Sequence, residues 1–376
     1  MPLSSLRISV KDIFDIKGLP TKAGSSIFAE WKGQVEDTAK YIDQLIQARA
    51  NLVGKVKTSH PFSPRADGYQ SCGSSFSGSA SAMATYGWLD ISIASDTDGS
   101  IRHPAAVVGL YGFRPSHGLI PVDGVLPALE WSDAVGLIAR DGKVIQQVFN
   151  ACYPAVKSPK VNTCLILSDD IANVGSDAWN IFSSFINELE RISGMGSKRI
   201  SISSLAPTQD DLLEDEEIPR AIAAWQWQQF GKLIYEDHQA KYQGRLAPFG
   251  HRVREAFKSA QYDGWGQDCL YVELTALDWL PTYREEKLND KRPPLAKRSN
   301  PLNPYVPASV GGCPHIVIPI GQVPFQSLVS NSLEMQPICA SLIGPPSSDL
   351  MILDLVDKLV KNGAIEPVKT GRTAFV

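Results

Sequence analysis

Hydrophobic and polar residues alternate with the period of a β-strand at several places in the first hundred residues. Residues 6–10 alternate in this way and end directly before Lys11, and residues 51–56 and 89–94 give two more predicted strands. Between the first two strands, residues 38–50 carry apolar positions at helical spacing. Strands that alternate with helices predict an α/β sheet.

The later part of the chain continues the same mixture. The predicted strands there are residues 162–168, 315–320 and 338–343. The predicted helices are residues 177–193, 218–241 and 349–361. No internal repeat and no long linker interrupts the sequence, so we expect one domain over residues 1–376.

Composition narrows the class of protein. Of the 376 residues, 43% are hydrophobic and 20% are charged, which is typical of a globular protein with a sizeable core. The net charge of -4 is spread without a charged block, so nothing favours a nucleic-acid or membrane-surface partner. The N-terminus lacks the layout of a signal peptide, and no run of eighteen apolar residues is present. We therefore expect a cytoplasmic protein.

Cysteine and histidine give no sign of a metal site. The six cysteines are far apart and form no CxxC pair. The six histidines lack the spacing of metal ligands, and we expect them, His315 included, in turns or on the surface. No glycine-rich phosphate loop precedes a predicted helix. The sequence therefore predicts neither a metal nor a cofactor.

Three separate segments suggest catalytic chemistry when they are taken together. Lys11 ends the first predicted strand, residues 71–79 are rich in serine and glycine, and Gly99-Ser100 follows the third strand. A serine hydroxyl becomes a good nucleophile only when a base removes its proton, and a desolvated lysine can do so. The glycine allows a close turn whose backbone N–H groups face a developing oxyanion. The set is typical of acyl transfer.

Two motifs resemble the amidase-signature family. Val10-Lys11-Asp12, with Asp15 to Thr21 and Gly24-Ser25, is similar to the lysine motif of these serine hydrolases. Ser95-Asp96-Thr97-Asp98-Gly99-Ser100-Ile101-Arg102 is similar to their nucleophile motif, Gly-Ser-Asp-Thr-Gly-Gly-Ser-Ile-Arg. The resemblance is specific over residues 54–124 and weaker later, at residues 316–321, and the whole looks closest to a fungal branch.

The resemblance implies a fold and a set of roles. The fold would be a large mixed β-sheet with helices on both faces, carrying a variable helical insert at about 155–300 that serves the substrate. Ser100 would attack the carbonyl carbon, Lys11 would be the final proton acceptor, and a serine held by a cis peptide would relay the proton. The backbone N–H groups that would bind the oxyanion belong to Thr97, Asp98, Gly99 and Ser100.

The chain departs from the family pattern at two positions. Counted back from Ser100 without gaps, the bridging position falls on Phe76, whose ring cannot relay a proton. Ser77 or Ser75 takes that role only if the loop shifts by one residue. Asp98 stands where the family has glycine, and a carboxylate there opposes the negative charge of the oxyanion.

Other residues receive supporting roles. Asp96 and Arg102 are expected to brace the nucleophile loop through charge-assisted hydrogen bonds. Phe76, Trp225 and Trp227 are weak candidates for substrate contacts, although two tryptophans in a helical pattern more often pack in a core. The family likeness also suggests a homodimer.

Three hypotheses for function follow. The first is hydrolysis of a small-molecule amide through an acyl-enzyme at Ser100, with Lys11 as base. The second is a repurposed scaffold that catalyses a non-hydrolytic step, such as a cyclisation in fungal secondary metabolism. The third is a binding protein without catalysis. Phe76 and Asp98 motivate the second, and a pocket closed by Phe76 would favour the third.

Overall fold

The computed structural model describes most of the two ends of the chain and parts of its middle. The described residues are 3–58, 77–153, 159, 161, 163–167, 175–200, 226–242, 305–327 and 329–375. Ser75, Phe76 and Trp225, and much of the predicted insert, lie outside these ranges. The prediction of one domain over the whole chain therefore stays a prediction.

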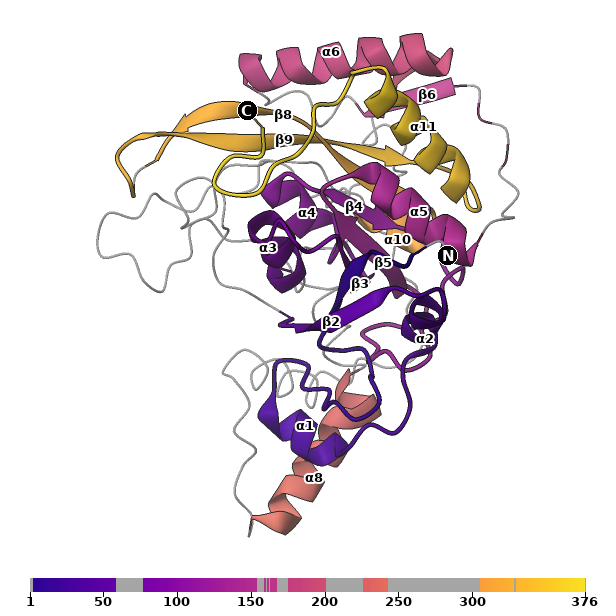
Figure 1. Ribbon diagram of the computed structural model, residues 1–376, viewed down its shortest axis with the longest axis vertical. Coiled ribbons are helices and arrows are strands. Elements are labelled where there is room, and N and C mark those ends of the chain that lie inside the picture. The colour runs from indigo at the N-terminus through magenta and orange to yellow at the C-terminus, as the bar shows by residue number, and fades with distance from the viewer. Residues whose placement is uncertain are drawn as a thin grey trace, which may run out of the picture.

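A mixed seven-stranded sheet forms the centre of the molecule, as predicted (Figure 1). Its strand order is β2-β1-β3-β5-β4-β8-β9. Strand β1 runs parallel to both of its neighbours, whereas the later pairs are antiparallel. The strands are β1 (Arg7–Lys11), β2 (Asn51–Val56), β3 (Ile91–Asp96), β4 (Tyr111–Arg114), β5 (Ala134–Ala139), β8 (His315–Gln326) and β9 (Leu333–Ile343).

Helices cover both faces of this sheet, because successive side chains of a strand point to opposite faces. In β3, Ile91 and Ile93 belong to one hydrophobic cluster with α2, α5 and α11, whereas Ala94 belongs to a second cluster with α3 and α4. Figure 1 shows α3 and α4 across the sheet from α5 and α11. These helices are α2 (Lys40–Gln47), α3 (Ser77–Thr85), α4 (Arg102–Val108), α5 (Gly142–Cys152) and α11 (Asp349–Lys361).

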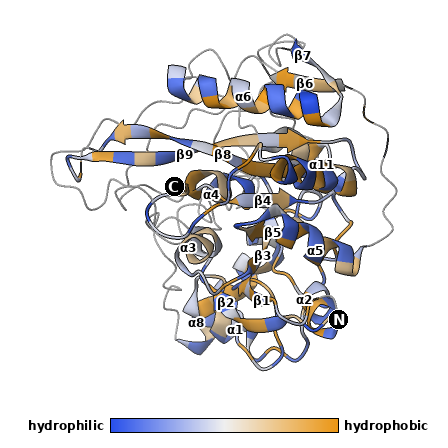
Figure 2. Cartoon of the chain, turned by 45° about the horizontal axis from the view of Figure 1, so that its top comes forward, coloured by the Kyte–Doolittle hydropathy of each residue, from blue (hydrophilic) through white to orange (hydrophobic). Residues whose placement is uncertain are grey.

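Two further groups of elements extend the sheet core. Helix α6 (Ser176–Ser193) packs on β8 and α11, and a two-stranded parallel sheet joins β6 (Thr163–Leu167) to β7 (Gly196–Ile200). Figure 2 shows hydrophobic and hydrophilic residues interleaved along α6, as expected of a helix with one buried side. At the other end of the molecule, α1 (Ser26–Lys32) packs against α8 (Lys232–Lys241).

Local sequence explains where several elements begin and end. The Ser25 side chain accepts a hydrogen bond from the Phe28 N–H and so caps α1. Asp141 caps α5 by accepting from the Lys143 N–H. Gly109 ends α4 in the left-handed conformation, at φ 63°.

The hydrophobic pattern located most strands but not their full extent. Residues 51–56 and 349–361 form the predicted strand and helix with the predicted bounds. Strands β8 and β9 run far beyond the predicted segments, because they pair with each other as a long antiparallel hairpin. In the predicted helix 218–241, the described part begins with a π-helical turn, Trp227–Gly231, before α8.

No helix in the ranges that the structure describes has both the length and the apolar character to cross a membrane.

Candidate active site

Lys11 is the last residue of β1 and lies on the face of the sheet that α3 and α4 cover. Its neighbours Ile8 and Val10 point to the opposite face and belong to the first hydrophobic cluster. Alternation therefore places Ser9 and Lys11 on the other face, where the Ser9 hydroxyl donates to Ser92 Oγ at 2.9 Å. Lys11 is only 4% exposed, so its amine is removed from water.

Ser100 lies just beyond the carboxyl end of β3, the strand beside β1. The two strands are parallel, with Val10 opposite Ile93, so their carboxyl ends meet at one edge of the sheet. The turn to Ser100 needs glycine at position 99, because φ there is +126° and an added Cβ would lie 2.8 Å from the Tyr305 ring. Ser100 is 8% exposed. The sheet thus brings the lysine and the serine to the same edge.

Asp96 is the anchor of the nucleophile loop. Its carboxylate accepts hydrogen bonds from the backbone N–H groups of Gly99, Ile101 and Arg102 at 2.9, 3.0 and 3.3 Å. Arg102 also donates from Nε and Nη2 at 2.9 and 2.6 Å, so the pair is bidentate. Both side chains are fully buried. The ion pair expected between Asp96 and Arg102 is therefore present, and it holds the loop.

Arg102 also has hydrogen-bond partners far along the chain that the sequence pattern did not predict. The Arg102 guanidinium donates to the Tyr305 carbonyl at 2.6 Å and to Ser309 Oγ at 2.7 Å. Its Nη1 also lies 2.8 Å from Nδ1 of His315. A guanidinium can only donate, so Nδ1 of His315 is the acceptor and carries no proton.

The surface or turn position expected for His315 is wrong. His315 begins β8 and is fully buried, and burial lowers the pKa of its imidazole well below the usual value. Arg114, the last residue of β4, is also fully buried, and it donates to the backbone carbonyl of Asp96 and, at 2.7 Å, to that of Ser132. A polar residue at the end of an apolar run was the available signal in both cases.

The electrostatics suit Lys11 to the role of a base. Burial, the largest effect, lowers the pKa of the Lys11 amine to about 7, although Asp133, Asp96 and Asp98 oppose the shift. These three carboxylates act on the amine because they share its edge of the sheet. Asp133, which the sequence analysis missed, accepts a hydrogen bond from Thr97 Oγ1 at 2.5 Å. A lysine with such a pKa is partly neutral at physiological pH and can accept a proton.

The backbone N–H groups of the loop are not equivalent. The Gly99 N–H is engaged by Asp96, so it is not available to an oxyanion in this structure. Thr97 is held on both sides, because its carbonyl accepts from Ser132 and its hydroxyl donates to Asp133. The Asp98 N–H donates to the carboxylate of the same residue, so the remaining candidate donors among the predicted ones are the N–H groups of Thr97 and Ser100.

Ser77 is the described candidate for the bridging serine. It is the first residue of α3 and is 2% exposed. An added Cβ on Gly78 would lie 2.0 Å from the carbonyl oxygen of Lys57, so the start of α3 touches the chain that leaves β2. Val56, the residue before Lys57, pairs with Lys11. The start of α3 therefore lies beside the strand end that carries Lys11, whereas Ser75 and Phe76 lie outside the described residues.

Trp227 packs in an aromatic cluster between α1 and α8. The centroids of the Trp227 and Tyr235 rings are 5.3 Å apart, and the cluster includes Phe28 and Phe230. A packing role is therefore evident for Trp227, and the substrate contact predicted for it stays a prediction.

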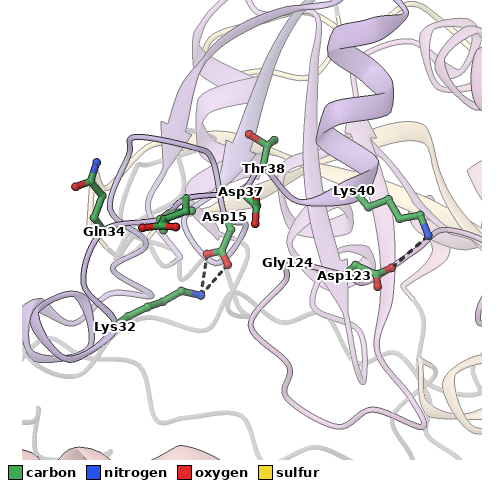
Figure 3. A pocket seen from close by; sticks show the side chains of 10 residues that line it. Asp15, Lys32, Gln34, Asp37, Thr38, Lys40, Asp123 and Gly124 are labelled. Atoms are coloured by element: carbon green, nitrogen blue, oxygen red, sulfur yellow. Dashed lines mark hydrogen bonds and ion pairs between the residues drawn. The ribbon is translucent and has the colours of Figure 1, made fainter.

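A separate pocket is lined mostly by polar and charged residues, which Figure 3 shows. It measures about 370 Å³, and neither Lys11, Ser77 nor Ser100 lines it. Two ion pairs lie among its lining residues, Lys32 with Asp15 at 2.8 Å and Lys40 with Asp123 at 3.9 Å. Within the described ranges, no group of three histidine, cysteine or acidic side chains is arranged to hold a metal ion.

Known proteins are most similar to this chain in its N-terminal part, which contains Lys11 and Ser100. The family described as Amidase matches residues 1–163. Amidase 1 of rice (Oryza sativa subsp. japonica) is 34% identical over 168 residues, which is 41% of this chain and 38% of that protein. Indoleacetamide hydrolase of Pseudomonas savastanoi is 35% identical over 154 residues, which is 37% of this chain and 33% of that protein.

A solved structure shares the fold over nearly the whole chain. It is described as an amidase, has a TM-score of 0.64 at 21% identity, and is matched over 95% of this chain and 84% of its own. The sequence match to the rice protein spans less than two-fifths of that protein's length.

Proposed function

We propose that this protein, whose residues 1–163 belong to the amidase-signature family, hydrolyses the amide bond of a small molecule through an acyl-enzyme at Ser100. The observation that carries the proposal is the shared sheet edge of Lys11 and Ser100, where burial brings the pKa of the lysine to about 7. A neutral buried amine beside a serine on a glycine turn is suited to activating that serine.

The reaction would begin with attack of Ser100 Oγ on the amide carbon. The hydroxyl proton would pass through a bridging serine, for which Ser77 is the described candidate, to the Lys11 amine. Backbone N–H groups of the loop would bind the oxyanion while the tetrahedral intermediate exists. Lys11 would then return the proton to the leaving nitrogen, the C–N bond would break, and water would release the acid from Ser100 by the reverse route.

The mechanism predicts a pH dependence set by Lys11. Only the neutral amine accepts a proton, and the lowered pKa of about 7 places its titration near neutrality. We expect kcat/KM for a small amide to rise about tenfold per pH unit below pH 7 and to level off above it. Lys11→Arg should abolish the activity at every pH, because a guanidinium does not lose its proton. A flat profile from pH 5 to 8 would contradict the role of Lys11 as base.

Covalent labelling tests the nucleophile without knowledge of the substrate. A fluorophosphonate probe should label the wild-type protein at Ser100 and leave Ser100→Ala unlabelled, and Lys11→Ala should be labelled far more slowly. Peptide mass spectrometry after labelling identifies the residue. Absence of labelling in folded wild-type protein would favour the two other hypotheses, a non-hydrolytic enzyme or a binding protein.

A further inference from the structure

Asp98 differs from every other residue in the nucleophile loop. Of residues 95–102, all are buried except Asp98, which is partly exposed. It lies two positions before Ser100, and two residues span at most about 7 Å of backbone. The carboxylate therefore belongs to the part of the loop that solvent reaches, close to Ser100 along the chain, and it acts electrostatically on Lys11.

The neighbours of Asp98 are held so firmly that its position is set by the loop. Before it, the Thr97 hydroxyl and carbonyl bond to Asp133 and Ser132. After it, the Gly99 N–H donates to Asp96, and the Tyr305 ring packs against Gly99. Because both flanks are anchored, the backbone of Asp98 is fixed relative to Ser100.

The Asp98 carboxylate lacks the partners that the other two acids possess. Asp96 is paired with two arginines, and Asp133 accepts from Thr97 and from two backbone N–H groups. Among the described residues, no side chain hydrogen-bonds to Asp98, and its own backbone N–H is its hydrogen-bond donor. Arg102 and Arg114 act on this carboxylate electrostatically, but neither is among the hydrogen-bond donors that the described residues offer it, so a cation that binds it directly would stabilise it.

We infer that Asp98 determines specificity by binding the ammonium group of a cationic substrate, an amide that carries a primary amine on the carbon next to the scissile carbonyl. This inference rests on the proposed function, because it names the substrate class of the same site. Asp98 and Ser100 are only two residues apart along the loop. The cation bound by Asp98 must therefore lie close to the carbonyl that Ser100 attacks, which is why we place the amine on the adjacent carbon.

A cationic substrate also resolves a conflict within the site. A bare carboxylate beside the nucleophile opposes the negative charge that develops on the oxyanion. An ammonium bound to Asp98 neutralises that charge before the reaction begins. The same positive charge disfavours protonation of Lys11, so binding of the substrate keeps the base in its neutral form.

Two amides of nearly the same shape test this inference. In alaninamide an ammonium group takes the place of one methyl group of isobutyramide, so the pair isolates the charge. At pH about 7, where the amine is mostly protonated, wild-type kcat/KM should favour alaninamide by about tenfold or more. In Asp98→Asn the ratio of the two values should fall to about one, mainly through a higher KM for alaninamide. Asp123→Asn, which removes an exposed carboxylate elsewhere, should keep the wild-type ratio.

Binding to Ser100→Ala separates this inference from the proposed function. Calorimetric titration should give tighter binding of alaninamide than of isobutyramide, and the double variant Ser100→Ala, Asp98→Asn should lose the difference. If that pattern is found while the wild type hydrolyses neither amide, the assignment of Asp98 holds and hydrolysis is refuted. Equal binding of the two amides to Ser100→Ala, or an unchanged turnover ratio in Asp98→Asn, would overturn the assignment of Asp98 whatever the turnover.

Discussion

Ser100→Ala should reduce amide turnover by about three orders of magnitude or more, because it removes the atom that forms the acyl-enzyme. Ser100 follows the glycine turn at the carboxyl end of β3 and is buried beside the strand end that carries Lys11. The measurement is kcat/KM on a panel of small amides, with the wild-type protein assayed in parallel.

Ser5→Ala serves as the matched control, because Ser5 is exposed and lies before β1. It should leave turnover unchanged. Lys11→Ala should lose about as much activity as Ser100→Ala, since residues that act as one unit are not additive. If Ser100→Ala hydrolyses the same amides at the wild-type rate, Ser100 has no part in the reaction.

Arg102→Ala should lower the free energy of unfolding by about 3–5 kcal/mol, because it leaves a buried carboxylate without its main partner. Asp96 and Arg102 are both fully buried and share two short hydrogen bonds. The change also removes the donors to Tyr305 and Ser309. Chemical denaturation followed by circular dichroism measures the loss.

Arg191→Ala is the comparison for this variant. Arg191 pairs with Glu188 one turn earlier on α6, where both side chains are exposed. Such pairs contribute little, so the denaturation midpoint should not shift measurably. A loss below about 1 kcal/mol in Arg102→Ala would show that the loop does not depend on the buried pair.

The sequence was sufficient to place the two candidate reactive residues near strand ends. The alternation of residues 6–10 and the apolar run of residues 89–94 predict two strands, and the two parallel strands bring Lys11 and Ser100 together. Lys11 ends β1, and Ser100 follows the end of β3 after one short turn, so local pattern places both residues near the carboxyl ends of these strands. The mixed sheet and its two helical layers came from the family resemblance, and the structure confirms them.

Long-range polar contacts could not be predicted in the same way. His315 and Arg114 sit at the ends of apolar strands, where local pattern does not distinguish a solvated end from a buried one. What makes burial of the Arg114 charge tolerable is Asp96, which lies on another strand. Strand β5 was missed because its residues 134–139 are buried on both faces, so they show no alternation.

The completion of the Arg102 network has a consequence for synthesis on the ribosome. Three of its partners, Tyr305, Ser309 and His315, lie 203, 207 and 213 residues further along the chain. Until they emerge, the guanidinium can pair with Asp96, but only water can satisfy its donors to these three residues. The loop that carries Ser100 should therefore reach its final, fully hydrogen-bonded conformation only late in translation, long after Ser100 itself has been added to the chain.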